Sequence, residues 1–325
     1  MSTRKAVVHK SEGVAEIRSD VPLPKLRDDY VIVKTKAVAL NPTDWRSLYS
    51  RTSPGAIVGC DYSGIVEEVG KTVTTPFKKG EKVAGFIYGA NPDNHDDGAF
   101  ADYITAKGDL QIRISDNPFT QSLGLPLPPA KVREPTTVLI YGASTATGTL
   151  AVQYAKLSGL TVIATASPHN FELVKFLGAD QVFDYKDPEC GAKIREATKD
   201  SLKLAFDTIS EKGSPAVCCA AISSKGGLYT SLLPVSDFPR DDVRNVATLA
   251  YTALGEKFSE RFPANQNDFD FEVRFWRLSE DLINSGKIKT HPTEVREGGL
   301  EAIPQGIEDL KGGRVSGVKL VYRMK

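Results

Sequence analysis

The stretch TVLIYGASTATG, residues Thr137–Gly148, decides the fold of this chain. Its first part, Thr137–Tyr141, is a short apolar run of the kind that forms a buried strand. A turn of small residues follows, and from Gly148 to Ser158 apolar side chains recur at helical spacing. The first backbone N–H groups of a helix have no partner within the helix, so they favour an anion. The stretch therefore predicts a strand, a phosphate-binding turn and a helix.

Downstream of this turn, strands and helices alternate. Strands are expected at 160–165, 181–185, 202–209 and 227–233, with helices at 171–177 and around Ile194. Such alternation is typical of a parallel sheet whose strands are joined by crossover helices. Later helices are expected at 271–285 and 300–311, and a closing strand at 318–322.

Upstream of the turn, the first third of the chain is β-rich. Residues 31–40 alternate around apolar positions, and glycines recur at turn-like intervals between Gly59 and Gly98. The proline-rich run at 125–129 is a stiff break before the pattern changes. The expected fold class is α/β, with a Rossmann-type doubly wound parallel sheet plus a β-rich domain.

The turn itself supplies the first candidate cofactor residues. Small side chains let a pyrophosphate approach the backbone. The candidates are Gly142, Ser144, Thr145, Ala146, Thr147 and Gly148. A structural turn that binds no ligand remains the alternative, and the strand–helix pairs that follow make it less favourable.

The end of the second strand indicates which dinucleotide is bound. An NAD site usually places an acid about 20 residues after the turn, where it binds the ribose 2′-hydroxyl. Residues 164–170 contain no acid, whereas Ser167, His169 and Asn170 can donate hydrogen bonds to a 2′-phosphate. Tyr185 could stack near the adenosine, and Leu233, at the end of the fifth strand, completes the predicted cofactor site. NADPH is therefore the predicted cofactor, although His169 could be a surface residue and Tyr185 a packing residue.

Composition narrows the class of protein. The 325 residues carry 41 Lys plus Arg and 41 Asp plus Glu, so the chain has no global charge that favours nucleic acid or an anionic membrane. The N-terminus has no signal-peptide pattern, and no apolar run approaches the length of a membrane span. Four cysteines without C-x-x-C spacing indicate reduced thiols, and the expected location is the cytoplasm.

Several segments together resemble the medium-chain dehydrogenase/reductase superfamily. They include residues 59–64, 77–83 and 98–103, the turn at 142–148, and later matches at 178–180, 206–207, 226–227 and 317–321. Residues Asn41–Arg46 and Ser167–Phe171 are similar to the fungal trans-acting enoyl reductases, which serve polyketide synthases in secondary metabolism.

This resemblance implies a specific organisation. A GroES-like substrate domain is expected at 1–125, completed by about 286–325, with a Rossmann domain at 132–285. The zinc-dependent branch carries its catalytic ligands where this chain has Asn41, Cys60 and Asp61, so no bound metal is expected.

The implied activity is NADPH-dependent reduction of an α,β-unsaturated acyl thioester. Hydride would go to the β-carbon of a substrate tethered to the acyl carrier domain of a polyketide synthase. The resemblance places Arg46 where it could position the substrate, and a solvated surface arginine is the alternative.

One segment departs from the family pattern. Family members usually have a longer helical stretch before the proline-rich linker, whereas here residues 115–117 run directly into 118–124. Two alternatives therefore stay open beside the enoyl reductase. One is a quinone or alkenal oxidoreductase of the same superfamily. The other is a catalytically inactive interaction subunit caused by the shortened segment near 117–119.

Overall fold

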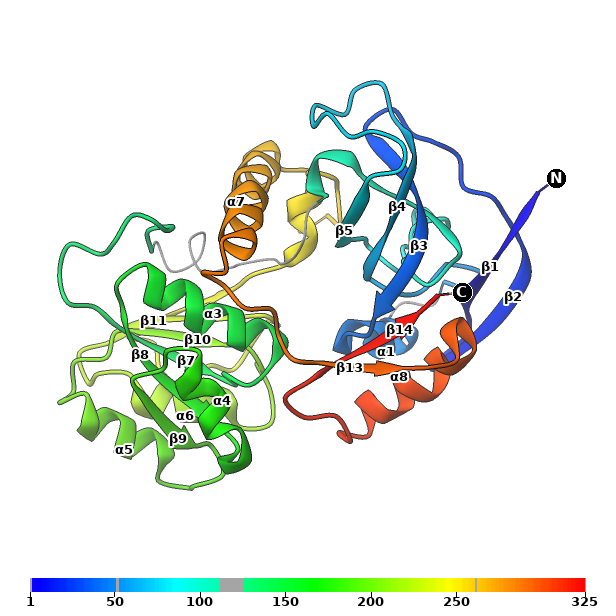
Figure 1. Cartoon of the computed structure of the whole chain (residues 1–325). Helices are drawn as coiled ribbons and strands as arrows, with labels where there is room; N and C mark the ends of the chain where they lie inside the picture. The colour runs from blue at the N-terminus through cyan, green and yellow to red at the C-terminus, as the bar shows by residue number, and fades with distance from the viewer. Residues whose placement is uncertain (1, 51–52, 112–124, 261, 325) are drawn as a thin grey trace. The chain divides into compact units, whose positions relative to one another are not determined.

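The computed structural model describes residues 2–50, 53–111, 125–260 and 262–324. It divides into two compact units (Figure 1). The first comprises Met1–Ser115, Tyr251–Asp281 and Pro292–Lys325, and the second comprises Asp116–Ala250 and Leu282–His291. The domain boundaries expected from sequence stay a prediction; the compact units differ from them mainly in grouping Tyr251–Asp281 with the β-rich part.

The first unit is built from antiparallel strands and short helices. Its strands are β1 (Thr3–Ser11), β2 (Val14–Pro22), β3 (Tyr30–Ala39), β4 (Asp61–Val69), β5 (Lys82–Phe86), β6 (Tyr103–Lys107), β13 (Thr293–Arg296) and β14 (Lys319–Arg323). Its helices are α1 (Pro42–Ser50), α8 (Ile303–Lys311) and most of α7 (Gln266–Asn284). Three 3-10 turns are η1 (Gly108–Leu110), η3 (Ala250–Leu254) and η4 (Gly299–Ala302). The main sheet has the order β13-β14-β3-β4-β5, with β6 also paired to β3, while β1 and β2 form a separate hairpin.

Alternating burial explains how this unit holds together. In β3, Val31 and Val33 are fully buried, and the core also takes residues from α8 and β14, such as Ile303 and Tyr322. The segment Tyr251–Asp281 packs on the same unit through aromatic side chains, because Trp276 of α7 stacks on Phe86 of β5 with ring centroids 6.0 Å apart. The C-terminal strand β14 pairs antiparallel with β3 and so joins the sheet of the N-terminal strands.

The second unit is a six-stranded parallel sheet in the order β12-β11-β10-β7-β8-β9. Its strands are β7 (Thr137–Tyr141), β8 (Thr161–Ala166), β9 (Gln181–Asp184), β10 (Leu204–Asp207), β11 (Gly227–Ser231) and β12 (Val243–Ala247). Its helices are α3 (Ala146–Leu157), α4 (Phe171–Phe176), α5 (Cys190–Ala197) and α6 (Ser214–Ala221), with a 3-10 turn, η2 (Pro168–Asn170), before α4. This strand order is that of the Rossmann fold, so the predicted fold class is confirmed.

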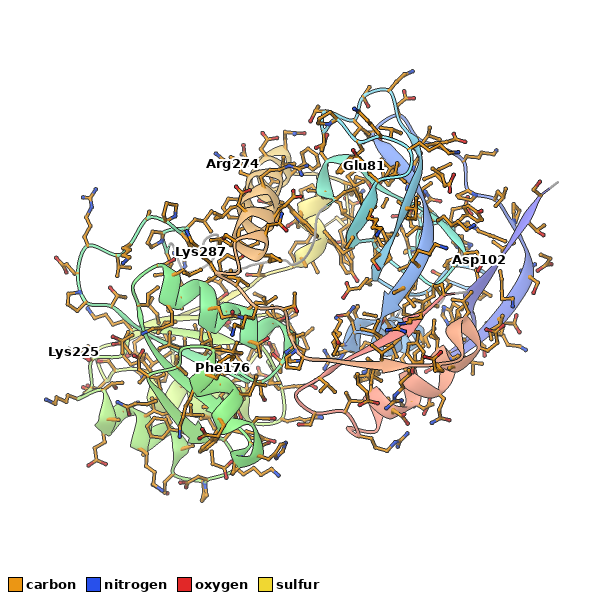
Figure 2. The ribbon with its side chains drawn as sticks, in the orientation of Figure 1. Glu81, Asp102, Phe176, Lys225, Arg274 and Lys287 are labelled. Carbon is orange, nitrogen blue, oxygen red and sulfur yellow. The ribbon has the colours of Figure 1, made fainter. Side chains whose placement is uncertain are left out.

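The period-two pattern of β7 separates the two cores of the second unit. Val138 and Ile140 pack with α3 and α4 on one face, whereas Leu139 and Tyr141 pack with α5 and α6 on the other. The two layers of helices can be followed in Figure 1. Phe176, labelled in Figure 2, lies at the end of α4 and is 68% exposed. The ammonium of Lys289 lies 4.1 Å from the centre of its ring.

The observed elements differ from the expected ones mostly at their ends. Helix α3 begins at Ala146 rather than at Gly148, because Thr145 caps it by accepting a hydrogen bond from the Gly148 N–H. The helix expected at 300–311 begins as the turn η4 and becomes α-helical at Ile303, next to Pro304. The sixth strand, β12, was not expected from the sequence.

Candidate functional site

Two glycines shape the turn after β7. Gly142 has φ +75°, a conformation that favours glycine. A Cβ atom on Gly148 would lie 2.3 Å from the carbonyl oxygen of Gly142 and 2.7 Å from the Cα of Ala143. The first turn of α3 therefore packs directly against the backbone that leaves β7, and only glycine allows this approach. Such a cradle fits the pyrophosphate of a dinucleotide.

The start of α3 provides the anion-binding groups. Thr145 accepts a hydrogen bond from the Gly148 N–H at 2.9 Å, and its hydroxyl lies 3.0 Å from that of Thr208. Ala146 and Thr147 are the first helical residues, whose N–H groups have no acceptor within a helix. Ser144 lies in the turn between them and β7. The six turn residues expected from the sequence thus come together at one helix N-terminus.

This turn lies where the strand order reverses. Strand β7 pairs with β8 on one side and β10 on the other, and the chain continues outward from both. Ligands of doubly wound sheets bind at such a point, beyond the carboxyl ends of the strands. The neighbouring strands also hold the turn in place: Thr165 accepts a hydrogen bond from the Gly142 N–H at 3.1 Å, and Thr208 donates to the Tyr141 carbonyl at 2.9 Å.

Ser167 precedes the 3-10 turn that follows β8, and His169 and Asn170 lie within this turn. His169 is exposed and Asn170 is buried. The Ser167 hydroxyl donates to the Tyr185 hydroxyl at 3.4 Å, and the Tyr185 ring is partly exposed, with its centroid 6.2 Å from that of Tyr141. These four residues therefore gather at the carboxyl ends of β8 and β9.

Leu233 follows β11, on the opposite side of the switch point. Its N–H donates to the Ser210 hydroxyl at 3.2 Å, and its carbonyl accepts from Ser231 at 2.8 Å. It thus lies at the carboxyl edge of the sheet with the other candidates for the dinucleotide site.

Sequence reasoning missed one acid at this edge. Asp184 is the register partner of Ala166, the residue just before Ser167. Its carboxylate accepts a hydrogen bond from the Lys186 N–H at 3.0 Å, within the turn that follows β9. Only strand pairing could have revealed it, because Asp184 lies on another strand.

The first unit carries the candidate substrate residue. Arg46 lies on α1, is half-buried, and its guanidinium is 5.2 Å from the centre of the Trp45 ring.

A polar cluster lies at the residues that replace the zinc ligands of the zinc-dependent branch. Lys319 pairs with Asp61 at 2.7 Å and donates to the Asn41 side-chain oxygen. Cys60 is buried, and its sulfur lies 3.3 Å from the Tyr251 hydroxyl. Among the described residues, no group of three or more His, Cys, Asp or Glu could hold a metal ion. The contacts that Lys319 makes with Asp61 and Asn41, and that Tyr251 makes with Cys60, join segments distant in the chain and were not expected from the sequence.

Comparisons with known proteins define the class. Residues 27–116 match the Alcohol dehydrogenase GroES-like domain, and residues 146–230 match the family named Zinc-binding dehydrogenase. A putative zinc-dependent alcohol dehydrogenase from Rhizobium etli shares the fold, with a TM-score of 0.80 at 22% identity, covering 100% of this chain and 99% of that one. The JamJ enoyl reductase shares it with a TM-score of 0.75 at 18% identity, covering 100% of both chains. The protein is thus a member of the medium-chain dehydrogenase/reductase superfamily, which implies a nicotinamide cofactor.

Its relatives identify the branch. The trans-enoyl reductase ACTTS2 of Alternaria alternata is 57% identical over 343 residues and is covered completely, as is this chain. The trans-enoyl reductase resD of Aspergillus sclerotiorum is 42% identical over 98% of this chain and 99% of its own length. The chain belongs to the trans-enoyl reductases and is an oxidoreductase that acts on carbon–carbon double bonds.

The same comparison bears on the shortened segment. The alignment to the Alternaria relative covers 343 residues, more than the 325 of this chain, so that relative carries residues that this chain lacks. The segment near 117–119, where the shortening was expected, lies outside the described residues.

Among the described residues, no helix is both long and apolar enough to cross a membrane.

Proposed function

We propose that this chain, a trans-enoyl reductase of fungal polyketide biosynthesis, uses NADPH to reduce α,β-unsaturated acyl thioesters carried by an acyl carrier domain. The observation that carries the proposal is the glycine cradle at Gly142 and Gly148, which lies at the switch point of the sheet and continues into the N-terminus of α3. When bound, the nicotinamide supplies the hydride for the β-carbon of the substrate. The protein positions both ligands and stabilises the charge that develops on the thioester oxygen.

The residues after β8 support NADPH over NADH. Ser167 and Asn170 can donate hydrogen bonds, exposed His169 adds a third donor, and Asp184 is held by its own turn. A 2′-phosphate accepts such bonds strongly because it is charged. Tyr185, beside Ser167, offers a partly exposed ring against which the adenosine can pack.

We expect the dissociation constant for NADPH to be at least about tenfold lower than that for NADH, a difference of about 1.4 kcal/mol. Fluorescence titration of the full chain with each cofactor measures it. Ser167→Asp, which sets a like charge against the phosphate, should remove the preference, whereas Ser167→Ala should only weaken it. Equal dissociation constants for the two cofactors in the unmodified protein would contradict the assignment.

Family membership implies cooperation with a polyketide synthase, and we infer that the direct partner is its acyl carrier domain. An acidic carrier would meet cations of the first unit. Lys36 is exposed on β3, Lys34 lies 5.9 Å from the Tyr103 ring centre, and Arg46 is half-buried on α1. A tethered substrate arrives at high effective concentration, so weak docking suffices.

The expected result is that carrier-bound enoyl thioester shows the highest kcat/KM and the steepest loss with salt, since exposed charges are screened beyond about 8 Å at physiological ionic strength. The comparison uses the same enoyl group on the carrier domain, on pantetheine and on a small thiol. Arg46→Glu should affect the carrier-bound substrate most, and Lys225→Glu, in the second unit (Figure 2), serves as the control. Faster reduction of a free quinone or alkenal than of every thioester would favour the general reductase instead.

A further inference from the structure

Between α7 and β13 the chain passes briefly through the second unit. It leaves the first unit after Asp281 and returns to it at Pro292, so residues Leu282–His291 belong to the second unit. These residues are called the return segment below. Only Leu282 and Ile288 of the return segment are buried, and most of its other side chains are exposed. Because the segment buries so little apolar surface, its order depends on the hydrogen bonds that attach it to the rest of the unit.

Gln153 of α3 binds the return segment through its side-chain amide. Its Nε2 donates to the Lys289 carbonyl at 2.9 Å, and its Oε1 accepts from the Lys289 N–H at 2.8 Å. The same Nε2 donates to the Thr149 carbonyl, one turn back in α3, at 3.1 Å. Gln153 is 7% exposed, and both hydrogens of its Nε2 are used in these bonds. The amide therefore joins the backbone of the return segment to the backbone of α3.

His291, the last residue of the return segment, contacts the same helix. Its Nδ1 lies 3.0 Å from the hydroxyl of Thr149, a fully buried residue. That hydroxyl also lies 3.0 Å from the Ala146 carbonyl, which can only accept. Because a hydroxyl has one proton, both bonds form together when Thr149 donates to Ala146 and the Nδ1–H of His291 donates to Thr149. Hydrogen bonds linked in such a chain polarise and strengthen one another.

The two contacts meet at Thr149, in the first turn of α3. This helix begins at Ala146, and the N–H groups of Ala146 and Thr147 are among those available to an anion. The ends of a helix open most easily, so contacts that restrain its first turn keep these N–H groups in place. His291 restrains the turn through the Thr149 hydroxyl, and Gln153 does so through the Thr149 carbonyl. The return segment thus supports the part of α3 that faces the predicted pyrophosphate.

We propose that His291 and Gln153 are positioning residues for the dinucleotide, which hold the first turn of α3 in the geometry that binds the pyrophosphate. NADPH binding in turn stabilises the return segment. The inference rests on the proposed function, because it requires the pyrophosphate of NADPH to lie at this turn. The coupling acts in both directions, since a change in one binding free energy is matched by an equal change in the other.

A purely structural role for these two residues predicts a different pattern. Support of the fold alone would affect every ligand of the second unit alike. Positioning of the first turn of α3 affects only ligands that carry a pyrophosphate. Adenosine 2′-monophosphate separates the two roles, because it has the 2′-phosphate proposed to lie after β8 and has no pyrophosphate.

The first test measures hydrogen exchange in the unmodified full chain. The Lys289 N–H, which donates to Gln153, reports on the attachment of the return segment. Saturating NADPH should slow its exchange by at least about fivefold, the low end of typical coupling between two sites. Saturating adenosine 2′-monophosphate should leave the exchange rate unchanged. Equal exchange of this N–H with and without NADPH would overturn the coupling.

The second test removes the contacts one at a time. His291→Leu and Gln153→Met should each raise the dissociation constant for NADPH by about three- to tenfold, as expected for lost hydrogen bonds, and leave that for adenosine 2′-monophosphate unchanged. His291→Asn, whose Nδ2 can take the place of Nδ1, should restore most of the NADPH affinity. Gln181→Met makes the Gln153 exchange at an exposed position at the amino end of β9, and as the control it should change neither constant. Fluorescence titration gives the NADPH constants, and competition with NADPH gives those for adenosine 2′-monophosphate.

The outcomes separate this inference from the proposed function. If the unmodified chain binds no NADPH, the proposed function itself fails. If NADPH binds but His291→Leu binds it as tightly as the unmodified chain does, His291 does not position the turn. If His291→Leu weakens both ligands equally, the residue only supports the fold of the unit. Should Gln153→Met fail to fold, the His291 variants and the exchange of the unmodified chain still decide the question.

Discussion

Replacing Gly148 with valine is expected to weaken NADPH binding strongly and so to lower activity at ordinary cofactor concentrations. Even the Cβ atom would meet the Gly142 carbonyl oxygen at 2.3 Å and the Ala143 Cα at 2.7 Å. Both are backbone atoms, which cannot rotate away as the end of a side chain can. Helix α3 must therefore move off the turn, and the N–H groups of Ala146 and Thr147 move with it.

Overpacking of this kind typically costs 1–3 kcal/mol, so the affinity for NADPH should fall by about 10- to 100-fold if the cofactor-bound state carries the cost. Isothermal titration and thermal unfolding of the same sample separate lost affinity from lost folding. Gly213→Ala is the control, because Gly213 has φ +87° but open space around it. It should cost some stability and leave NADPH binding unchanged. Unaltered NADPH binding in Gly148→Val would show that the cradle does not hold the cofactor.

Replacing Asp207 with alanine is expected to cause the largest loss of stability. Asp207, at the end of β10, is fully buried, and burial raises the pKa of its carboxyl despite four hydrogen-bond donors. These donors are the N–H groups of Ile209 and Ser210, both at 2.9 Å, and the hydroxyls of Ser214 and Tyr229, at 2.5 and 2.8 Å. Alanine leaves all four without their acceptor in a buried place.

Each unsatisfied buried donor costs about 1–3 kcal/mol, so a total of about 3 kcal/mol or more is expected even after partial relaxation. This lowers Tm by roughly 6–12 °C for a domain of this size. The loop that follows contains Thr208, which hydrogen-bonds the phosphate turn, so NADPH affinity should fall as well. Glu172→Ala is the control: its exposed carboxylate in the same unit pairs only with Lys175 among the described contacts, and such pairs contribute about 0–1 kcal/mol. Equal melting temperatures for the two variants would rule out the Asp207 network as a main support of this unit.

The cofactor half of the protein could be predicted from local sequence pattern. Thr137–Gly148 combines strand and helix periodicity with small residues at the turn, and these depend only on near neighbours in the chain. The same holds for the alternation that produced the parallel sheet. The absence of a bound metal, which the residue types at Asn41, Cys60 and Asp61 led us to expect, stays a prediction.

Tertiary structure alone decided the polar network of the first unit. Tyr251 and Cys60 are separated by 191 positions, and nothing near either residue in the sequence indicates the other. The grouping of Tyr251–Asp281 with the β-rich unit depends on packing such as Trp276 on Phe86. Periodicity reports which face of an element is buried, but not which element covers that face. The sequence by itself therefore determined the fold class and the predicted dinucleotide turn, whereas the contact between Tyr251 and Cys60 formed only when distant segments packed together.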